Sequence, residues 1–192
     1  EYQNAAGVLN NDGRLYDEYG LHNSEYSIDA IFYNGYRNTK VFAYMGVPKH
    51  GEKEKLPAVI LLHGGLGRAE LEWVKKWNDA GFVAIAPDLY GDGPEPDEEN
   101  PYKTHMKKHP YAGVYPWDGN AFLKDFENAG MYQNVVSVIY ANNLLRSLPF
   151  ADKSKIGAVG ISWGGITAVI SCGADSRLAF GASVYGCGSL YD

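Results

Sequence analysis

A serine enclosed by glycines is the residue of this sequence best suited to chemistry. Ser162 lies in the segment GISWGG, residues 160–165, with one glycine two positions before it and another two positions after it. The apolar residues before it are typical of a buried strand, and the apolar segment after it is typical of a helix packed on a sheet. A strand can pass into a helix through one residue only where the residues two positions away lack bulk. Ser162 is therefore predicted to have a strained backbone at the start of a helix.

Such a position suits a nucleophile. A hydroxyl raised above the edge of a sheet can attack a carbonyl carbon, and the N-terminus of the helix favours the negative charge that then develops. The alternative is an ordinary serine in a tight strand–helix turn, as nucleotide-binding folds contain. The segment has neither a dinucleotide-binding glycine pattern nor a Walker lysine, which favours the nucleophile.

Two further segments follow predicted strands. LLHGGLG, residues 61–67, ends a continuous apolar run, and its glycines allow the backbone to approach a ligand closely. His63 in this segment is interpreted as a residue that serves loop structure rather than as a base. Asp88, in APDLYGDG, comes after another buried strand and is predicted to fix the turn through side-chain hydrogen bonds, outside the catalytic set.

The remaining pattern alternates strands with helices. Between residue 91 and about residue 130, prolines, glycines, charges and aromatics follow no period, which predicts a lid-like excursion over the sheet edge. Strands are expected at 26–33, 40–47, 56–65, 82–87, 156–161 and 179–186, and helices at 69–80, 131–147 and 164–172. The order predicts an α/β fold, a mostly parallel sheet flanked by helices. Residues 1–25 are expected to form a polar surface segment and residues 26–192 a single domain.

With HGGLG, GFVAIAPDLYGDG and GISWGG in this order, the chain resembles the α/β-hydrolase superfamily. DKSKIGAVGISWGG (152–165) and VYGCG (184–188) are similar to segments of its acetyl xylan esterase-like and prolyl-oligopeptidase-like branch. The resemblance extends from about residue 28 to the end of the sequence. It implies the α/β-hydrolase fold, a serine nucleophile, an acyl-enzyme intermediate and a histidine held by an aspartate, with no metal or organic cofactor.

The resemblance also implies where the oxyanion is held. In such folds one N–H donor follows the nucleophile and the other lies in the loop after the third strand. These positions are Trp163 and Gly65, with Leu66 as the alternative to Gly65. The expected function is a serine carboxyl-ester hydrolase that deacetylates a carbohydrate or small ester. The alternatives are a serine peptidase of the prolyl-oligopeptidase type and a non-catalytic hydrolase-like binding domain.

The acid and histidine of the triad are not found where the resemblance places them, after the serine. All five histidines precede it: His22, His50, His63, His105 and His109. Of the two later carboxylates, Asp175 is expected to act in a turn or cap, and Asp192 is the last residue and is expected to be frayed.

Three explanations stay open: the sequence is part of a longer hydrolase, which is favoured; a second chain completes the site; or a histidine of the excursion reaches Ser162. On the first, the last strands are absent. This chain alone is then expected to be inactive or very weak, with an unpaired apolar sheet edge.

Composition limits the partners. The chain has 192 residues, a net charge of −6 and 45% hydrophobic residues, which predicts one globular domain with a sizeable core. The charge argues against nucleic acid and anionic membranes, and no apolar run approaches the roughly 20 residues of a membrane span.

Cys172 and Cys187 are interpreted as free buried thiols, although a disulfide between them stays open. The expected partner is an ester substrate. Many proteins of this branch act outside the cytoplasm, which favours an exported protein.

Overall fold

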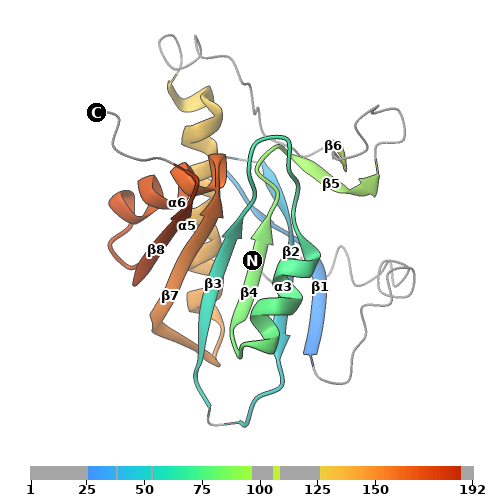
Figure 1. The fold of residues 1–192 in the computed structure, drawn as a ribbon, viewed down its shortest axis with the longest axis vertical. Helices are drawn as coiled ribbons and strands as arrows, with labels where there is room; N and C mark the ends of the chain where they lie inside the picture. The colour runs from blue at the N-terminus through green and yellow to red at the C-terminus, as the bar shows by residue number, and fades with distance from the viewer. Residues whose placement is uncertain (1–25, 38, 53, 97–105, 109–125, 187–192) are drawn as a thin grey trace.

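A six-stranded sheet is the centre of the fold (Figure 1). The computed structural model describes residues 26–37, 39–52, 54–96, 106–108 and 126–186. The strand order is β1-β2-β4-β3-β7-β8. The strands are β1 (Tyr26–Asn34), β2 (Lys40–Pro48), β3 (Leu56–Leu62), β4 (Val83–Pro87), β7 (Ala151–Ile161) and β8 (Phe180–Val184). β2 pairs antiparallel with β1 and β4, whereas β4, β3, β7 and β8 pair in parallel. The predicted mostly parallel sheet is confirmed.

In the part of the chain that the structure describes, three α-helices cover the two faces of the sheet. α3 (Leu71–Asp79) lies on one face, and α5 (Gly130–Ser147) and α6 (Trp163–Ala174) lie on the other (Figure 1). The expected helix at 69–80 begins later than predicted, at Leu71, because residues 69 and 70 have other contacts and another backbone conformation. The N–H of Ala69 donates to a carboxylate oxygen of Asp88, and Glu70 has an extended backbone.

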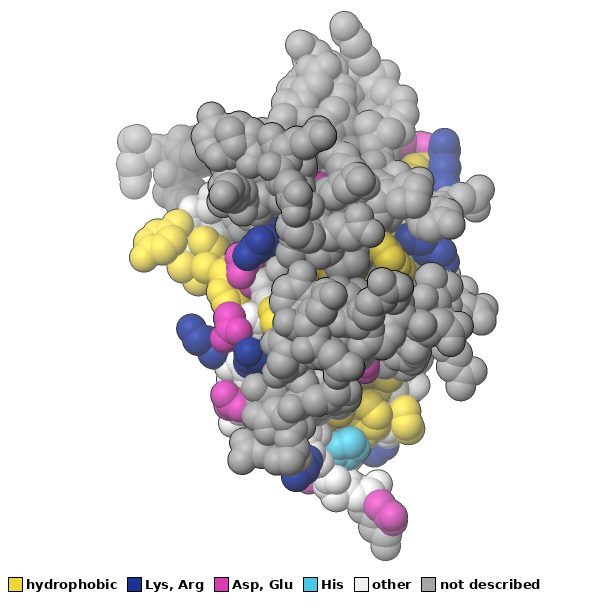
Figure 2. Space-filling model, turned by 90° about the vertical axis from the view of Figure 1, so that its right-hand side faces the viewer, with side chains coloured by type: hydrophobic (Ala, Val, Ile, Leu, Met, Phe, Trp, Pro, Cys, Tyr) yellow, Lys and Arg dark blue, Asp and Glu magenta, His cyan; other side chains and the backbone are white. Residues whose placement is uncertain are grey.

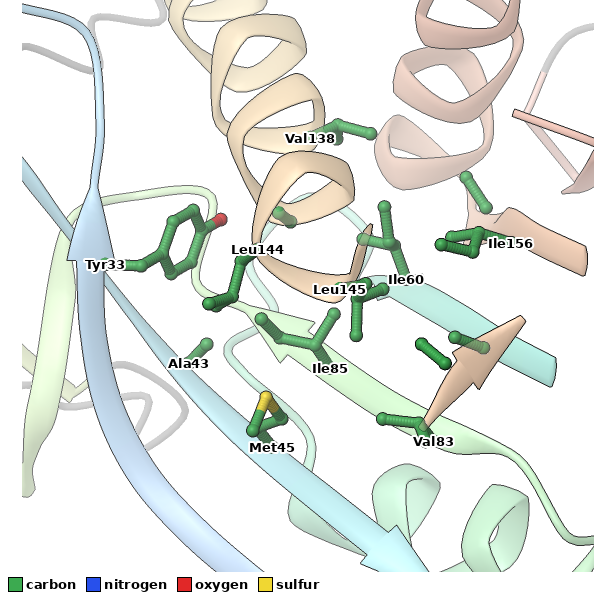
Figure 3. Close-up of a cluster of buried hydrophobic side chains, with 14 of the residues drawn as sticks. Tyr33, Ala43, Met45, Ile60, Val83, Ile85, Val138, Leu144, Leu145 and Ile156 are labelled. Atoms are coloured by element: carbon green, nitrogen blue, oxygen red, sulfur yellow. The ribbon is translucent and has the colours of Figure 1, made fainter. Parts of the chain in front are cut away.

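The core is divided by the sheet into two clusters, as the period of a strand requires. On β2, the side chains of Ala43 and Met45 pack toward α5, while those of Phe42 and Tyr44 pack toward α3. Figure 3 shows part of the α5 side, with labelled Tyr33, Ala43, Met45, Ile60, Val83, Ile85, Val138, Leu144, Leu145 and Ile156. A large aliphatic side chain buried in this way contributes about 1.5–3 kcal/mol. This packing fixes the position of the carboxyl ends of the parallel strands.

Part of the predicted excursion has regular structure. β5 (Asp92–Pro96) and β6 (Met106–Lys108) form a separate two-stranded antiparallel sheet, and a short 3₁₀ helix, η1 (Phe126–Asn128), precedes α5. The rest of the expected lid-like excursion, including His105 and His109, lies outside the described residues. The predicted surface segment at residues 1–25 lies outside them as well.

β8 forms one edge of the sheet, and among the described residues no strand pairs with its outer side. Phe180 and Val184 of β8 are 39% and 38% exposed. Val169 and Ile170 of the adjacent α6 are also exposed. The described part of the chain therefore has the exposed apolar edge that was expected.

The surface on the β1 side carries mixed charge. In Figure 2, the lysine, arginine and acidic side chains that are visible beside the grey residues are interspersed. No helix in the described part of the chain is long and apolar enough to cross a membrane.

Candidate active site

Ser162 lies in the turn between β7 and α6 with a backbone that few residues adopt. Its φ is 52° and its ψ is −115°, and its side chain is exposed. Positive φ costs a non-glycine residue about 1–3 kcal/mol, and it persists only where neighbours hold it. Here the Ser162 N–H donates to the carbonyl of Val184 on β8 (2.8 Å), and the Ser162 carbonyl accepts from the N–H of Ile166 (3.0 Å). The strained serine predicted from the spacing is thus present.

The glycines around the serine are required by close backbone contacts. A Cβ added to Gly160 would lie 2.1 Å from the carbonyl oxygen of Gly164. One added to Gly164 would lie 2.2 Å from the carbonyl oxygen of Leu62. Both distances are far below van der Waals contact, so any side chain there would displace the turn.

The glycine-rich loop after β3 lies directly against the serine. A Cβ on Gly64 would be 3.3 Å from the Cβ of Ser162, so Gly65, which follows and is exposed, belongs to the same surface. The Leu66 N–H donates to the hydroxyl of Tyr90 (3.2 Å), and the Gly67 N–H donates to the Gly64 carbonyl (3.1 Å). Among the described residues nothing accepts from the Gly65 N–H. Of the two N–H groups of this loop, that of Leu66 thus has an acceptor on Tyr90.

Trp163 is the first residue of α6, where backbone N–H groups have no acceptor inside the helix. Its indole is held on α5 by the side-chain amide of Asn134. The amide is assigned the orientation that satisfies both neighbours: its oxygen then accepts from Trp163 Nε1 (2.9 Å) and its nitrogen donates to the carbonyl of Leu89 (2.9 Å). Asn134, which the sequence analysis did not single out, thus connects the start of α6 to the turn after β4.

His63 is buried, and both ring nitrogens are engaged. Nε2 accepts from the N–H of Leu89 (2.8 Å), so Nδ1 carries the proton and donates to the carbonyl of Gly64 (2.8 Å). The prediction that His63 serves loop structure is confirmed. The other described histidine, His50, bonds to the Pro48 carbonyl and packs on Phe150, just before the start of β7, whereas Ser162 follows the end of β7. Neither described histidine can take a proton from the serine.

Asp88 organises the turn after β4. Oδ1 accepts from the N–H groups of Tyr90 (2.8 Å) and Asp92 (2.9 Å), and Oδ2 accepts from the N–H of Ala69 (3.3 Å). Burial raises the pKa of this carboxyl group to about 6, against the lowering effect of the backbone hydrogen bonds. The predicted role of Asp88 in the turn is confirmed.

Asp175 lies at the C-terminal end of α6, where its carboxylate binds side chains of the surrounding structure. Its carboxylate accepts from Arg177 Nε (2.7 Å) and Nη2 (2.8 Å), and from the side-chain amide of Asn142 on α5 (2.9 Å). The bond from Arg177 lowers the pKa of Asp175 to about 2. The expected turn or cap role is confirmed.

The two cysteines of the sequence are also chemically active groups. Cys172 is a half-buried free thiol whose pKa is raised by burial, and Cys187 lies outside the described residues. Within the described ranges, no three His, Cys, Asp or Glu side chains are grouped to hold a metal ion.

The fold and this site define a class of protein. A mostly parallel sheet, a strained serine between β7 and α6, and a glycine-rich loop after β3 together make the chain an α/β hydrolase. The sequence profile of the acetyl xylan esterase (AXE1) family matches residues 10–187. The chain belongs to the acetyl xylan esterase family.

Solved structures agree with this placement. An acetyl xylan esterase from Paenibacillus sp. R4 is similar with a TM-score of 0.63 and 25% identity, over 93% of this chain and 57% of that one. Acetyl xylan esterase 1 from Thermoanaerobacterium sp. JW/SL YS485 has a TM-score of 0.63 and 19% identity, over 82% and 47%. An acylaminoacyl peptidase from Pyrococcus horikoshii shares the fold at a TM-score of 0.55. The chain thus spans about half the length of these esterases. No curated protein sequence matches it.

Proposed function

We propose that this chain carries the nucleophile and the oxyanion donors of a serine esterase that removes acetyl groups from a carbohydrate or small ester. The observation that carries the proposal is the strained Ser162 at the N-terminus of α6, with the loop of Gly64 and Gly65 against it. Membership of the acetyl xylan esterase family supports the ester as substrate.

The chemistry assigned to Ser162 is acyl transfer. Its Oγ attacks the ester carbonyl, whose π electrons move to the oxygen, and the N–H groups of Gly65 and Trp163 stabilise that oxyanion. Collapse of the tetrahedral intermediate breaks the bond to the alcohol and leaves an acyl-enzyme. Water then releases acetate and restores the serine hydroxyl.

The proton of Ser162 passes to a base and then to the departing alcohol oxygen. His63 is excluded as this base because both of its ring nitrogens are occupied, and His50 because it lies beside the start of β7 while Ser162 follows its end. The proposal therefore assigns the proton transfer to a histidine that is not among the described residues.

Labelling with a fluorophosphonate tests the proposal on the complete protein. Such a reagent phosphonylates an activated serine, and peptide mass spectrometry locates the adduct. We expect modification at Ser162 and none in the Ser162→Ala variant, which removes only the hydroxyl. Turnover of acetyl esters should fall in that variant to the residual that binding and oxyanion stabilisation supply, roughly 10³–10⁴-fold above the uncatalysed rate.

Substrate choice is tested in the same preparation. Acetylated oligosaccharide and aryl acetate should turn over faster than peptide anilides. Faster cleavage of anilides would replace the esterase with a peptidase of the same mechanism. An unmodified Ser162 in the complete wild-type protein would overturn both, in favour of a binding domain.

A further inference from the structure

Three hydrogen bonds connect the loop beside Ser162 to the turn after β4. The Leu66 N–H donates to the Tyr90 hydroxyl (3.2 Å), and the Ala69 N–H donates to Asp88 (3.3 Å). The Leu89 N–H donates to His63 (2.8 Å). The first of these bonds is made by the residue after Gly65, the proposed oxyanion donor. Of the three bonds, it therefore restrains the backbone nearest to that donor.

Leu66 is held in a conformation that leucine disfavours. The bond from the Gly67 N–H to the Gly64 carbonyl closes a four-residue turn in which Leu66, the third residue, has a φ of 63°. A turn with positive φ at that position ordinarily contains glycine or asparagine. The Leu66 side chain is 70% exposed, so packing of the side chain does little to hold it there. The strain must be balanced by backbone contacts, and the Tyr90 hydroxyl is one of them.

Tyr90 itself is well placed to act as a fixed acceptor. It is only 8% exposed, its backbone N–H donates to the buried Asp88, and its ring packs on His63 with centroids 5.3 Å apart. The hydroxyl therefore belongs to the rigid turn after β4 rather than to a mobile side chain.

We propose that Tyr90 is a positioning residue for oxyanion stabilisation: its hydroxyl binds the Leu66 N–H, holds Leu66 at positive φ, and so keeps the Gly65 N–H on the Ser162 side of the loop. The bond also occupies the Leu66 N–H, which leaves Gly65 as the loop donor. This assignment rests on the proposed esterase function and adds to it a residue that does not touch the substrate.

The variant Tyr90→Phe removes the hydroxyl and keeps the ring on His63. In the complete protein we expect kcat for aryl acetate to fall at least about tenfold, less than the roughly 10²–10³-fold loss caused by removing an oxyanion donor itself. KM should stay within about twofold, because the donor acts on the transition state and not on the bound ester. The rate of fluorophosphonate modification at Ser162 should fall in parallel.

Tyr33→Phe is the matched control. The Tyr33 hydroxyl is also buried and donates to the backbone carbonyl of Ser137, but it joins β1 to α5 away from the loop. This variant should lose stability while its kcat stays at the wild-type value. Equal effects of the two variants on kcat would overturn the proposal.

A second variant separates positioning from general support of the fold. Glycine adopts positive φ without strain, so the effect of Tyr90→Phe is also measured in a Leu66→Gly background, against the kcat of Leu66→Gly itself. In that background Tyr90→Phe should cost less than it does beside leucine, because the strain that the hydroxyl restrains is gone. This comparison also serves if the single Tyr90→Phe variant does not fold.

The remaining outcomes are distinct. If wild-type Ser162 reacts and Tyr90→Phe reacts at the same rate, the positioning role fails while the esterase stands. If wild-type Ser162 does not react, the proposed function fails and the positioning role with it. Equal costs of Tyr90→Phe in both backgrounds, or failure to fold in both, would make Tyr90 a structural residue and overturn the assignment.

Discussion

At the scale of single residues, the site depends on glycines, which have no Cβ atom. Ser162 keeps its positive φ because Gly160 and Gly164 let the backbones of β7, α6 and the β3 loop approach within distances that no Cβ allows. The position of the Ser162 hydroxyl is therefore determined by these close backbone contacts, which only glycine allows, and not by a contact of the hydroxyl itself. This makes substitution at the glycines more harmful than their small size suggests.

Two glycines of α6 give a matched comparison. A Cβ at Gly164 would lie 2.2 Å from the Leu62 carbonyl oxygen and 2.5 Å from that of His63, whereas one at Gly173 would meet nothing within 4 Å. We expect Gly164→Ala to lower the free energy of unfolding by about 1–3 kcal/mol. Gly173→Ala should raise it by up to about 1 kcal/mol, since alanine favours a helix. Urea unfolding measures both, and equal effects would contradict the contact argument.

At the scale of elements, α6 is fixed at both ends. Its start carries Ser162 and Trp163, and Asn134 of α5 binds the Trp163 indole. Its end carries Asp175, which binds Asn142, also of α5. Any displacement of α6 along α5 would break bonds at both ends, so the two helices locate the serine as a unit.

The C-terminal connection of α6 predicts a pH dependence. The pKa of Asp175 is lowered to about 2 from an ordinary 3.8, so the stabilisation it gives is present above about pH 4 and is lost as the pH falls toward 2. Asp175→Asn should lower the free energy of unfolding by about 1–2 kcal/mol near neutral pH, with allowance for the partly exposed Arg177.

The difference between wild type and Asp175→Asn should shrink when urea unfolding is repeated near pH 3, because the wild-type carboxylate then begins to protonate. A difference that stays constant with pH would show that the charge contributes nothing. Asp152→Asn serves as the control, since Asp152 bonds only to Ser154 and Lys155, two exposed residues of the same strand β7, and should have a much smaller effect.

Sequence reasoning found the parts of this site that local pattern determines. The spacing around Ser162 and the glycines after β3 encode backbone shape, which neighbouring residues decide. Tyr90 and Asn134 were not found, because the partners of each lie far along the chain and a tyrosine or asparagine has no distinctive spacing. The late start of α3 had the same cause: the N–H of Ala69, before the helix, donates to Asp88, which the helical period of residues 69–80 does not show.

At the scale of the whole molecule, the β8 edge decides behaviour in solution. An unpaired strand with exposed apolar side chains is a template for pairing with another chain. Phe180 and Val184 present such an edge, and the exposed Val169 and Ile170 extend it onto α6. A chain that pairs with this surface would therefore contact β8, the strand whose Val184 carbonyl accepts from the Ser162 N–H.

We therefore expect the 192-residue chain to self-associate with rising concentration and Phe180→Lys to reduce it, since a charge on an edge strand opposes pairing. Sedimentation velocity over a concentration series measures the effect. Tyr140→Lys is the control, because Tyr140 is similarly exposed, at 37% against 39%, but lies on α5. Equal reduction by both variants would point to net charge rather than to the edge.

The hydrogen bond from the Ser162 N–H to the Val184 carbonyl has a consequence for synthesis. A chain leaves the ribosome with its N-terminus first, at about 5–20 residues per second. Ser162 leaves the ribosome before Val184 does, so the bond that holds the serine in its strained conformation cannot form until β8 has been made. The nascent chain therefore lacks this bond until β8 has left the ribosome, and the geometry proposed for catalysis is completed only then.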